Sequence, residues 1–224
     1  TVYPDADSRT SRDPVEAPAG QPEPSQFSVA DRFWNRNSFA FAVGALLILW
    51  AWKVYSTWGA WGDLTIDSGR EMYVPGLLAQ GKMLYRDVRY IYGPAAPYLN
   101  SYLFRIFGVH LDVLYWAGSL AALGSSVLLY LIGVKLRSPL AGWAAGSVVL
   151  MQSFHPSLFC FPLAYSFASV YGCLVACAFL LLAVQATTAR RWYWMFGAGS
   201  AAAAALLLKL EFGMACYGAL FLLL

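Results

Sequence analysis

The sequence predicts an all-α protein, a polytopic bundle of transmembrane helices with two interfacial helices in its first outer loop. Hydrophobic residues make up 59% of the 224 residues and charged residues only 12%, whereas a soluble domain carries about 25% charged residues. The apolar residues form runs that are long enough to cross a bilayer. One stretch after the first run, residues 63–94, holds charges of both signs. The net charge of +3, without a basic stripe, argues against a nucleic-acid partner.

Residues 1–37 are polar and rich in proline, and they cannot bury enough apolar surface to fold. We expect them to form a disordered cytoplasmic tail, followed by a transmembrane domain over residues 38–224. The tail is too long before the first apolar run to be a signal peptide. The chain starts with Thr1 and ends in a run of leucines, so we expect it to be part of a longer protein.

The apolar runs predict five membrane spans and the start of a sixth. The spans are expected at residues 39–59, 112–134, 140–154, 163–186 and from 193 onward. A single helix over residues 193–224 would be ~48 Å long at ~1.5 Å per residue, which exceeds the ~30 Å hydrocarbon core. The polar residues in "KLEFG", at 209–213, predict the break between the fifth and sixth spans. In the third span, "GWAAG" at 142–146 has the small-xxx-small spacing of closely packed helices.

The four cysteines lie in apolar runs and show no disulfide framework. Cys173 and Cys177 are one helical turn apart, which is compatible with a metal or thiol pair but more typical of small residues in a buried helix.

Basic residues orient the spans, because cytoplasmic loops are enriched in lysine and arginine. Arginines precede the first span, and basic pairs follow the second and fourth spans at residues 135–137 and 190–191. All three positions fall on one side of the predicted bundle. The sequence therefore predicts a cytoplasmic N-terminus and an outer loop at residues 60–110.

The outer loop contains two predicted helices that lie in the membrane interface. Residues 96–108, "APYLNSYLFRIFG", place their large apolar side chains in one helical stripe, which should face the lipid. A second helix is expected over residues 68–80, from Ser68 to Gly81, with a bend at residues 75–76. "YGP" at 92–94 predicts the turn between the two helices.

Several motifs of this loop occur in an order that resembles a known family. They are Asp67 with Gly69 and Tyr73, "AQGKMLYRD" at 79–87, "YGP" at 92–94, "YLNSYLFRIFG" at 98–108 and, later, "LKLEFG" at 208–213. This series resembles the polytopic lipid-sugar glycosyltransferases of the C-type superfamily, which include protein O-mannosyltransferases and bacterial aminoarabinose transferases. The resemblance extends from Trp50 to Gly213. Many relatives carry a second acid after the first, and here that position is Ser68.

The resemblance implies an enzyme that transfers a sugar from a polyprenyl-phosphate donor to an acceptor at the outer face of a membrane. It implies a bacterial plasma-membrane protein that acts without a cofactor; the acceptor, a lipid, glycan or protein, is not specified. Asp67 would be the general base, and cations would stabilise the departing phosphate. The implied substrate-binding residues are Glu71, Arg86, Asp87, Arg89, Tyr92, His155, Lys209 and Glu211.

The residues themselves leave simpler roles open. Asp67 suits the cap of the helix that starts at Ser68, and Glu71 suits a solvated ion pair with Arg70 or Arg86. Arg86 and Asp87 suit a local surface pair worth under ~1 kcal/mol.

The polar residues nearer the spans have alternatives as well. His155 suits a structural role, or contact with the acceptor or with a divalent metal, although no metal site is assigned. Lys209 and Glu211 suit either the substrate or charges that extend from a span's end to the interface.

At the level of function, the alternatives are a non-catalytic lipid-binding subunit and a transporter element. A transporter is disfavoured because the charge lies in an outer loop and no inverted repeat is evident.

Overall fold

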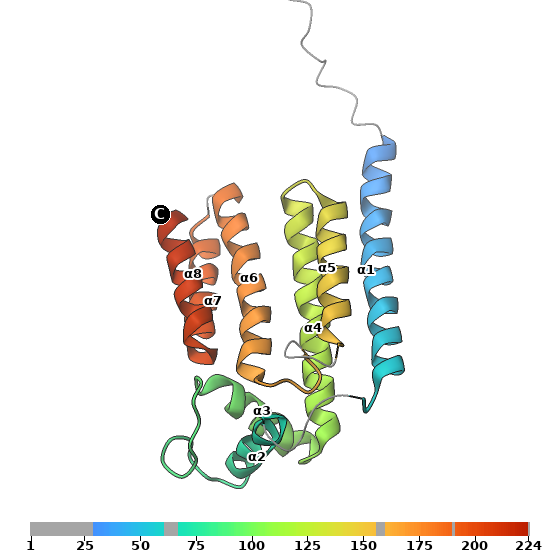
Figure 1. Ribbon diagram of the computed structural model, residues 1–224. Helices are drawn as coiled ribbons and strands as arrows, with labels where there is room; N and C mark the ends of the chain where they lie inside the picture. Colours follow the sequence, from blue (N-terminus) through green and yellow to red (C-terminus); the bar gives the residue numbers. More distant parts are fainter. Residues whose placement is uncertain (1–28, 61–66, 156–159, 190, 224) are drawn as a thin grey trace, which may run out of the picture. The chain divides into compact units, whose positions relative to one another are not determined.

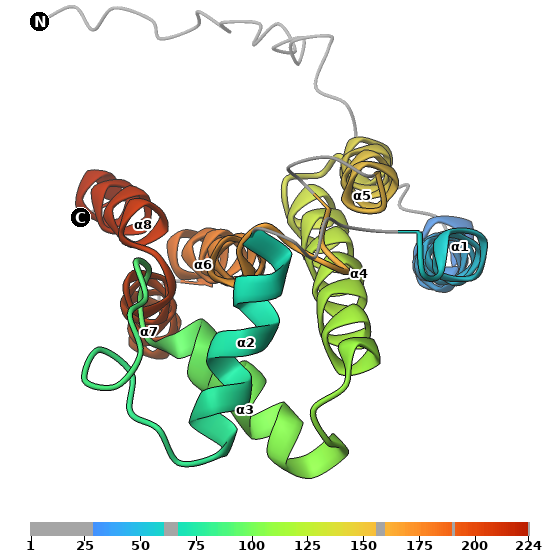
Figure 2. The same cartoon turned by 60° about the horizontal axis from the view of Figure 1, so that its bottom comes forward.

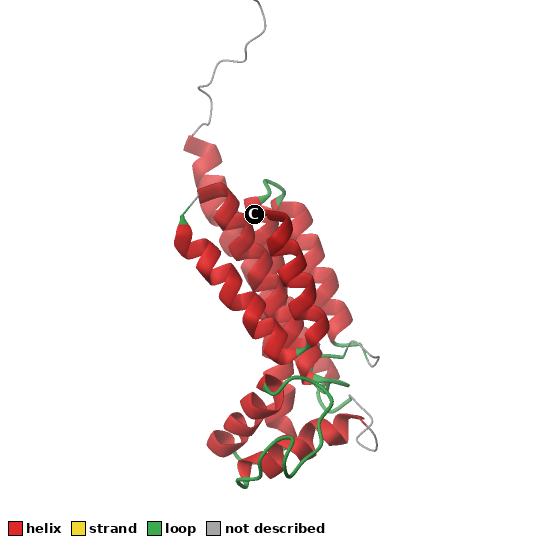
Figure 3. Ribbon diagram, turned by 90° about the vertical axis from the view of Figure 1, so that its left-hand side faces the viewer, coloured by secondary structure: helices red, strands yellow, loops and turns green. Residues whose placement is uncertain are grey.

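A computed structural model describes residues 29–60, 67–155, 160–189 and 191–223. The chain divides into two units, Thr1–Ser38 and Phe39–Leu224, which are considered separately. The described residues form eight helices and no strand, as Figure 3 shows, which confirms the all-α prediction. The helices are α1 Val29–Thr57, α2 Asp67–Ala79, α3 Ala95–Phe107, α4 Leu111–Lys135, α5 Pro139–Ser153, α6 Phe167–Ala189, α7 Trp192–Leu208 and α8 Leu210–Leu223.

Within the second unit, α4 to α8 run side by side, and α2 and α3 lie at one end of this bundle (Figure 1). Figure 2 views the molecule toward that end and shows α2 and α3 crossing each other over it. The turn from α4 to α5, the C-terminal end of α6 and the N-terminal end of α7 lie at the opposite end of the bundle (Figure 1). The apolar runs therefore alternate in direction as the sequence predicted.

Three helices are long and apolar enough to cross a membrane, which indicates a membrane protein. They are the Ser38–Thr57 part of α1, with a mean hydropathy of 1.6, α4 with 1.8 and α6 with 2.4. The remaining apolar helices sit where spans were expected but are shorter. α5, α7 and α8 have 15, 17 and 14 residues, which correspond to ~21–26 Å at ~1.5 Å per residue.

The first helix begins earlier than the sequence suggested. α1 starts at Val29, so residues 29–37, which we had placed in the disordered tail, are helical. The last proline of the tail is Pro24, and nothing after it interrupts the i→i−4 hydrogen bonds that extend the helix back from the first span. The rest of the predicted tail, residues 1–28, lies outside the described residues.

Glycines allow α4 and α5 to pack with their backbones in contact. A Cβ atom on Gly142 would lie 2.7 Å from the Cα atom of Gly133, and one on Gly146 would lie 2.6 Å from the carbonyl oxygen of Ser126. Both distances are shorter than side chains tolerate. The small-xxx-small prediction for residues 142–146 is thus confirmed as a helix-packing motif.

The two loop helices are fastened to each other and to the bundle by polar contacts. Arg105 of α3 donates a hydrogen bond of 2.9 Å to the carbonyl oxygen of Leu78 in the last turn of α2, which also accepts a hydrogen bond from the Gly81 N–H. On the opposite face of α3, Asn100 is fully buried and accepts a hydrogen bond from the hydroxyl of Tyr171 in α6. In the predicted apolar stripe of α3, Tyr98, Leu99, Tyr102, Ile106 and Phe107 are all exposed.

The predicted break between the fifth and sixth apolar runs is confirmed at Lys209. This residue has extended backbone angles, φ −157° and ψ 130°, between α7 and α8. The two helices then pack closely, since a Cβ atom on Gly213 would lie 2.5 Å from the Cα atom of Leu206. The break lies at the end of the bundle that carries α2 and α3 (Figure 1).

Candidate functional site

The candidate site lies where four segments converge at this end of the bundle. The turn before α3 docks on the end of α7, because the N–H of Gly93 donates to the carbonyl oxygen of Leu208 over 3.1 Å. The approach requires glycine, since a Cβ atom on Gly93 would collide with the carbonyl oxygen of Leu207. The "YGP" turn thus brings Tyr92 to the α7–α8 break, beside the first turns of α2 and α6.

The Lys209 side chain points toward the place where these four segments meet. Its Nζ atom donates a hydrogen bond of 3.0 Å to the Oγ atom of Ser169 in α6. The same ammonium lies 5.0 Å from the centroid of the Tyr92 ring, within the range of a cation–π contact. Lys209 is therefore held at the site and does not simply extend toward solvent.

Arg70 places a second cation on the same tyrosine. Its guanidinium lies 5.7 Å from the centroid of the Tyr92 ring and 5.8 Å from that of Tyr165. It also donates a hydrogen bond of 3.3 Å to the carbonyl oxygen of Tyr165. On the other side, Arg70 Nη1 lies 3.2 Å from Asp67 Oδ1, one helical turn away. Asp67, Arg70, Tyr92 and Lys209 thus form one continuous cluster, which we call the Asp67 cluster.

Asp67 is the first residue of α2 and is half-buried. A carboxylate at this position stabilises the positive end of the helix dipole, which agrees with the helix-terminus role that the sequence left open. Its pairing with Arg70 also fixes the direction in which the carboxylate points. The general-base role is compatible with this placement and remains a prediction.

Glu71 lies buried next to the Asp67 cluster. Its side chain is buried, with 2% exposure, and its carboxylate accepts hydrogen bonds of 3.0 Å from the Tyr90 hydroxyl and the Phe167 N–H. Phe167 is the first residue of α6, so Glu71 satisfies an N–H group that the helix leaves without a partner. Of the solvated ion pair that the sequence left open, the partner Arg70 is confirmed but the solvated surroundings were wrong, because Glu71 is desolvated and connects α2 to α6. Arg70 Nε lies 3.7 Å from its carboxylate.

Burial shifts the acid–base behaviour of this region. Burial raises the pKa of the Glu71 carboxyl above its usual 4.5, while the hydrogen bonds from Phe167 and Tyr90 and the charge of Arg70 oppose the rise. Burial, with the neighbouring Tyr165 hydroxyl, also raises the pKa of Tyr92 to about 12. The pKa of Tyr90 is raised by burial and by the Glu71 carboxylate. Both tyrosines consequently stay protonated at neutral pH and act as hydrogen-bond donors, not as bases.

Two of the expected substrate-binding residues pair with each other instead. Arg86 Nε donates a hydrogen bond of 2.9 Å to Asp87 Oδ1, and Arg86 is 68% exposed. Asp87 also accepts a hydrogen bond of 2.9 Å from the Met83 N–H. The hydrogen bonds from Arg86 and Met83 lower the pKa of Asp87 to about 2. The local surface pair is therefore the role that the contacts favour.

The remaining predicted residues lie outside the Asp67 cluster. Arg89 is exposed, and Glu211 is exposed in the first turn of α8. His155 is exposed at the end of α5, and residues 156–159, which follow it, lie outside the described part. Within the described residues, no group of three or more histidines, cysteines and acids could hold a metal ion.

Sequence reasoning overlooked three members of the site: Arg70, Tyr165 and Ser169. Arg70 carried a signal, because it lies three residues after Asp67 and therefore on the same helix face. Tyr165 and Ser169 belong to the entry of α6 and carried no comparable pattern. Comparison with protein-family models, curated proteins and solved structures finds no match to this chain.

Proposed function

We propose that the Asp67 cluster transfers a sugar from a polyprenyl-phosphate donor to an acceptor at the outer face of the membrane. The observation that supports this proposal is a series of contacts in which the Asp67 carboxylate pairs with Arg70, and Arg70 and Lys209 both lie over the Tyr92 ring. Asp67 and Arg70 come from α2, and Lys209 comes from the α7–α8 break more than a hundred residues later. The ordered motifs that resemble the C-type superfamily point to the same chemistry.

The proposed reaction uses Asp67 as the base. The acceptor hydroxyl or amine attacks the anomeric carbon from the face opposite the phosphate, and Asp67 takes the acceptor's proton. The bond between the anomeric carbon and the phosphate oxygen breaks through an oxocarbenium-like transition state, as in glycoside hydrolysis. The bonding electrons leave with the phosphate, which gains negative charge.

Arg70 and Lys209 are the cations that we assign to the departing phosphate. Fixed positive charges that are in place before the reaction stabilise charge as it develops, and a guanidinium suits phosphate oxygens particularly well. This assignment replaces Arg86, which pairs with Asp87, and Arg89, which is exposed. Glu71 stabilises the cluster from its buried side, and we assign it no contact with the substrate.

Replacement of Asp67 by asparagine in the full-length protein tests the proposal. Asn keeps the side-chain shape but cannot take a proton, so transfer of a labelled sugar from the polyprenyl donor should fall by a factor of about 10²–10⁴. The unfolding temperature should change little. Asp87→Asn is the matched control, because it neutralises a carboxylate that pairs with Arg86 and Met83.

Full transfer activity in Asp67→Asn would exclude the base role. A full-length wild-type protein that bound the polyprenyl phosphate but transferred no sugar would instead favour a non-catalytic lipid-binding subunit or a transporter element of the same architecture. In that case Arg70 and Lys209 would bind the lipid phosphate without a reaction.

A further inference from the structure

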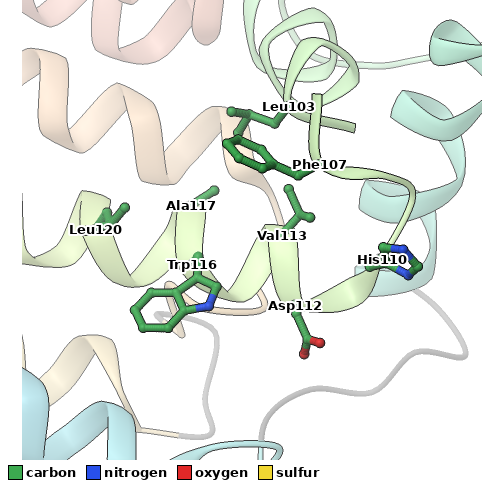
Figure 4. Close-up of a pocket in the computed structure, with 8 residues that line it drawn as sticks. All are labelled: Leu103, Phe107, His110, Asp112, Val113, Trp116, Ala117 and Leu120. Atoms are coloured by element: carbon green, nitrogen blue, oxygen red, sulfur yellow. The ribbon is translucent and has the colours of Figure 1, made fainter. Parts of the chain in front are cut away.

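A pocket lies between α3 and α4, and its lining shares no residue with the Asp67 cluster. It is a groove of about 410 Å³, within the range of ~300–1,000 Å³ typical of small-molecule pockets. Leu103 and Phe107 form one wall from α3, as Figure 4 shows. The α4 wall consists of Asp112, Val113, Trp116, Ala117 and Leu120.

The walls follow from helical spacing. Leu103 and Phe107 are four residues apart and form one ridge of α3, while residues 112, 116 and 120 form a ridge of α4. The α4 ridge spans about 12 Å at ~1.5 Å per residue. Because α4 has the length and apolarity of a membrane span, a hydrocarbon chain can lie along this ridge with its head at the N-terminal end of the helix.

The polar groups of the groove gather at that end. His110 immediately precedes α4, and Asp112 lies in its first turn. Both side chains are exposed, and Asp112 forms no ion pair with any other described residue. Among the residues that the structure describes, no lysine or arginine lines the groove. The head-group end therefore carries an unpaired carboxylate and an imidazole.

The negative charge of Asp112 determines which lipid head group the groove can bind. A polyprenyl phosphate has an anionic head, which Asp112 would repel and which fits the cations of the Asp67 cluster instead. A primary ammonium complements the carboxylate and donates hydrogen bonds to it. The imidazole of His110 donates at least one N–H in every protonation state, which suits a phosphodiester oxygen beside that ammonium.

We propose that this groove binds a bilayer aminophospholipid of the phosphatidylethanolamine type. The ammonium pairs with Asp112, the phosphate accepts a hydrogen bond from His110, and one acyl chain lies between α3 and α4 against Trp116 and Leu120. The protein would thus hold two lipids of opposite head-group preference, a phosphate at the Asp67 cluster and an ammonium at the groove.

Native mass spectrometry of the full-length protein, with equal amounts of phosphatidylethanolamine and phosphatidylglycerol, tests the inference. The wild-type protein should retain phosphatidylethanolamine about tenfold better, as expected for a charge-assisted hydrogen bond. Asp112→Asn should abolish this preference. Ala117→Phe should fill the groove and reduce retention of both lipids, whereas Ala203→Phe, at an exposed position of α7, should leave both unchanged.

The carboxylate also stabilises the N-terminus of α4 through the helix dipole, and a purely structural role predicts lower stability without a change in lipid preference. Equal retention of the two lipids by the wild-type protein, or an unchanged preference in Asp112→Asn, would overturn the inference. Competition for the groove by polyprenyl phosphate, at the same concentration as phosphatidylethanolamine, would overturn it as well.

Discussion

The buried carboxylate of Glu71 connects the loop after α2 to the start of α6. It accepts hydrogen bonds from Tyr90 in the loop and from the Phe167 N–H at the start of α6. Its burial follows from the way α2 settles on the bundle, which is a tertiary property that the pattern of neighbouring charges does not reveal. Because Arg70 is adjacent in the sequence, the charge pattern suggested a solvated ion pair. The two side chains nevertheless take different roles. Arg70 faces the Asp67 cluster, and Glu71 faces the helix junction.

The raised pKa of Glu71 predicts that the stability of the protein depends on pH. Because the pKa of the buried carboxyl lies above its usual 4.5, the folded state holds the proton more tightly than the unfolded state. The resulting stabilisation is complete below the unfolded pKa and is lost as the pH rises through the raised pKa. Glu71→Gln should abolish this dependence, so its unfolding temperature should equal or exceed that of the wild type at pH 8, whereas at pH 4 the protonated wild type should be as stable as the variant or more stable.

Glu71→Ala provides the contrast for the same thermal-unfolding series in detergent. Alanine leaves the Phe167 N–H and the Tyr90 hydroxyl without an acceptor, which should cost about 1–3 kcal/mol at every pH. If glutamine destabilised the protein as much as alanine at pH 8, the carboxylate charge itself would be required and the argument from desolvation would fail.

Lys209 and Arg86 are both basic residues near the same end of the bundle, but their contacts separate them. Lys209→Met should weaken binding of the polyprenyl-phosphate donor by about tenfold, because it removes one charged partner of the phosphate. Arg86→Ala should change donor binding by less than about twofold, since exposed pairs contribute little. Titration of both variants with the donor in detergent micelles measures the difference. A larger loss of donor binding in Arg86→Ala than in Lys209→Met would place the donor site in the exposed loop instead.

At the scale of helices, the packing of α4 on α5 was predictable from the sequence and the position of α2 was not. The spacing of Gly142 and Gly146 specifies a close backbone approach, because small residues at this interval leave a flat strip along one helix face. The partners across the contact, Gly133 and Ser126, become known only from the structure. Likewise, the start of α2 follows from its sequence, whereas its contact with α6 depends on the single buried carboxylate of Glu71.

Two glycine-to-alanine changes of opposite sign test the packing of α4 on α5. Gly146→Ala should destabilise the protein by about 1–3 kcal/mol, because the new methyl group would meet the backbone of Ser126. Gly199→Ala in α7 has no atom within 4 Å of the added methyl group, and it should stabilise the helix by up to about 1 kcal/mol. Reversible unfolding in mixed micelles compares the two, and equal effects would refute close packing at Gly146.

At the scale of the whole chain, the succession of apolar runs predicted that Asp67 and Lys209 share one end of the bundle. Each run reverses the direction of the chain, so the break after the fifth run returns to the end where the first run finished. The structure links the two residues indirectly, because Asp67 pairs with Arg70, and Arg70 and Lys209 both lie over the ring of Tyr92. The inner partners, Tyr165 and Ser169, were beyond reach because they depend on how α6 enters the bundle.

The same alternation makes a testable statement about membrane topology. Ser138, in the turn between α4 and α5, and Lys82, in the loop after α2, are both exposed and lie at opposite ends of the bundle (Figure 1). The basic residues near Ser138 predict that this turn is cytoplasmic. Single cysteines at these positions, in a background without the four native cysteines, should therefore react differently in intact cells. A membrane-impermeant thiol reagent should label Lys82→Cys before lysis and Ser138→Cys only after lysis. Labelling of both positions before lysis would refute a membrane-crossing bundle, and the reversed order would move the Asp67 cluster to the cytoplasmic face.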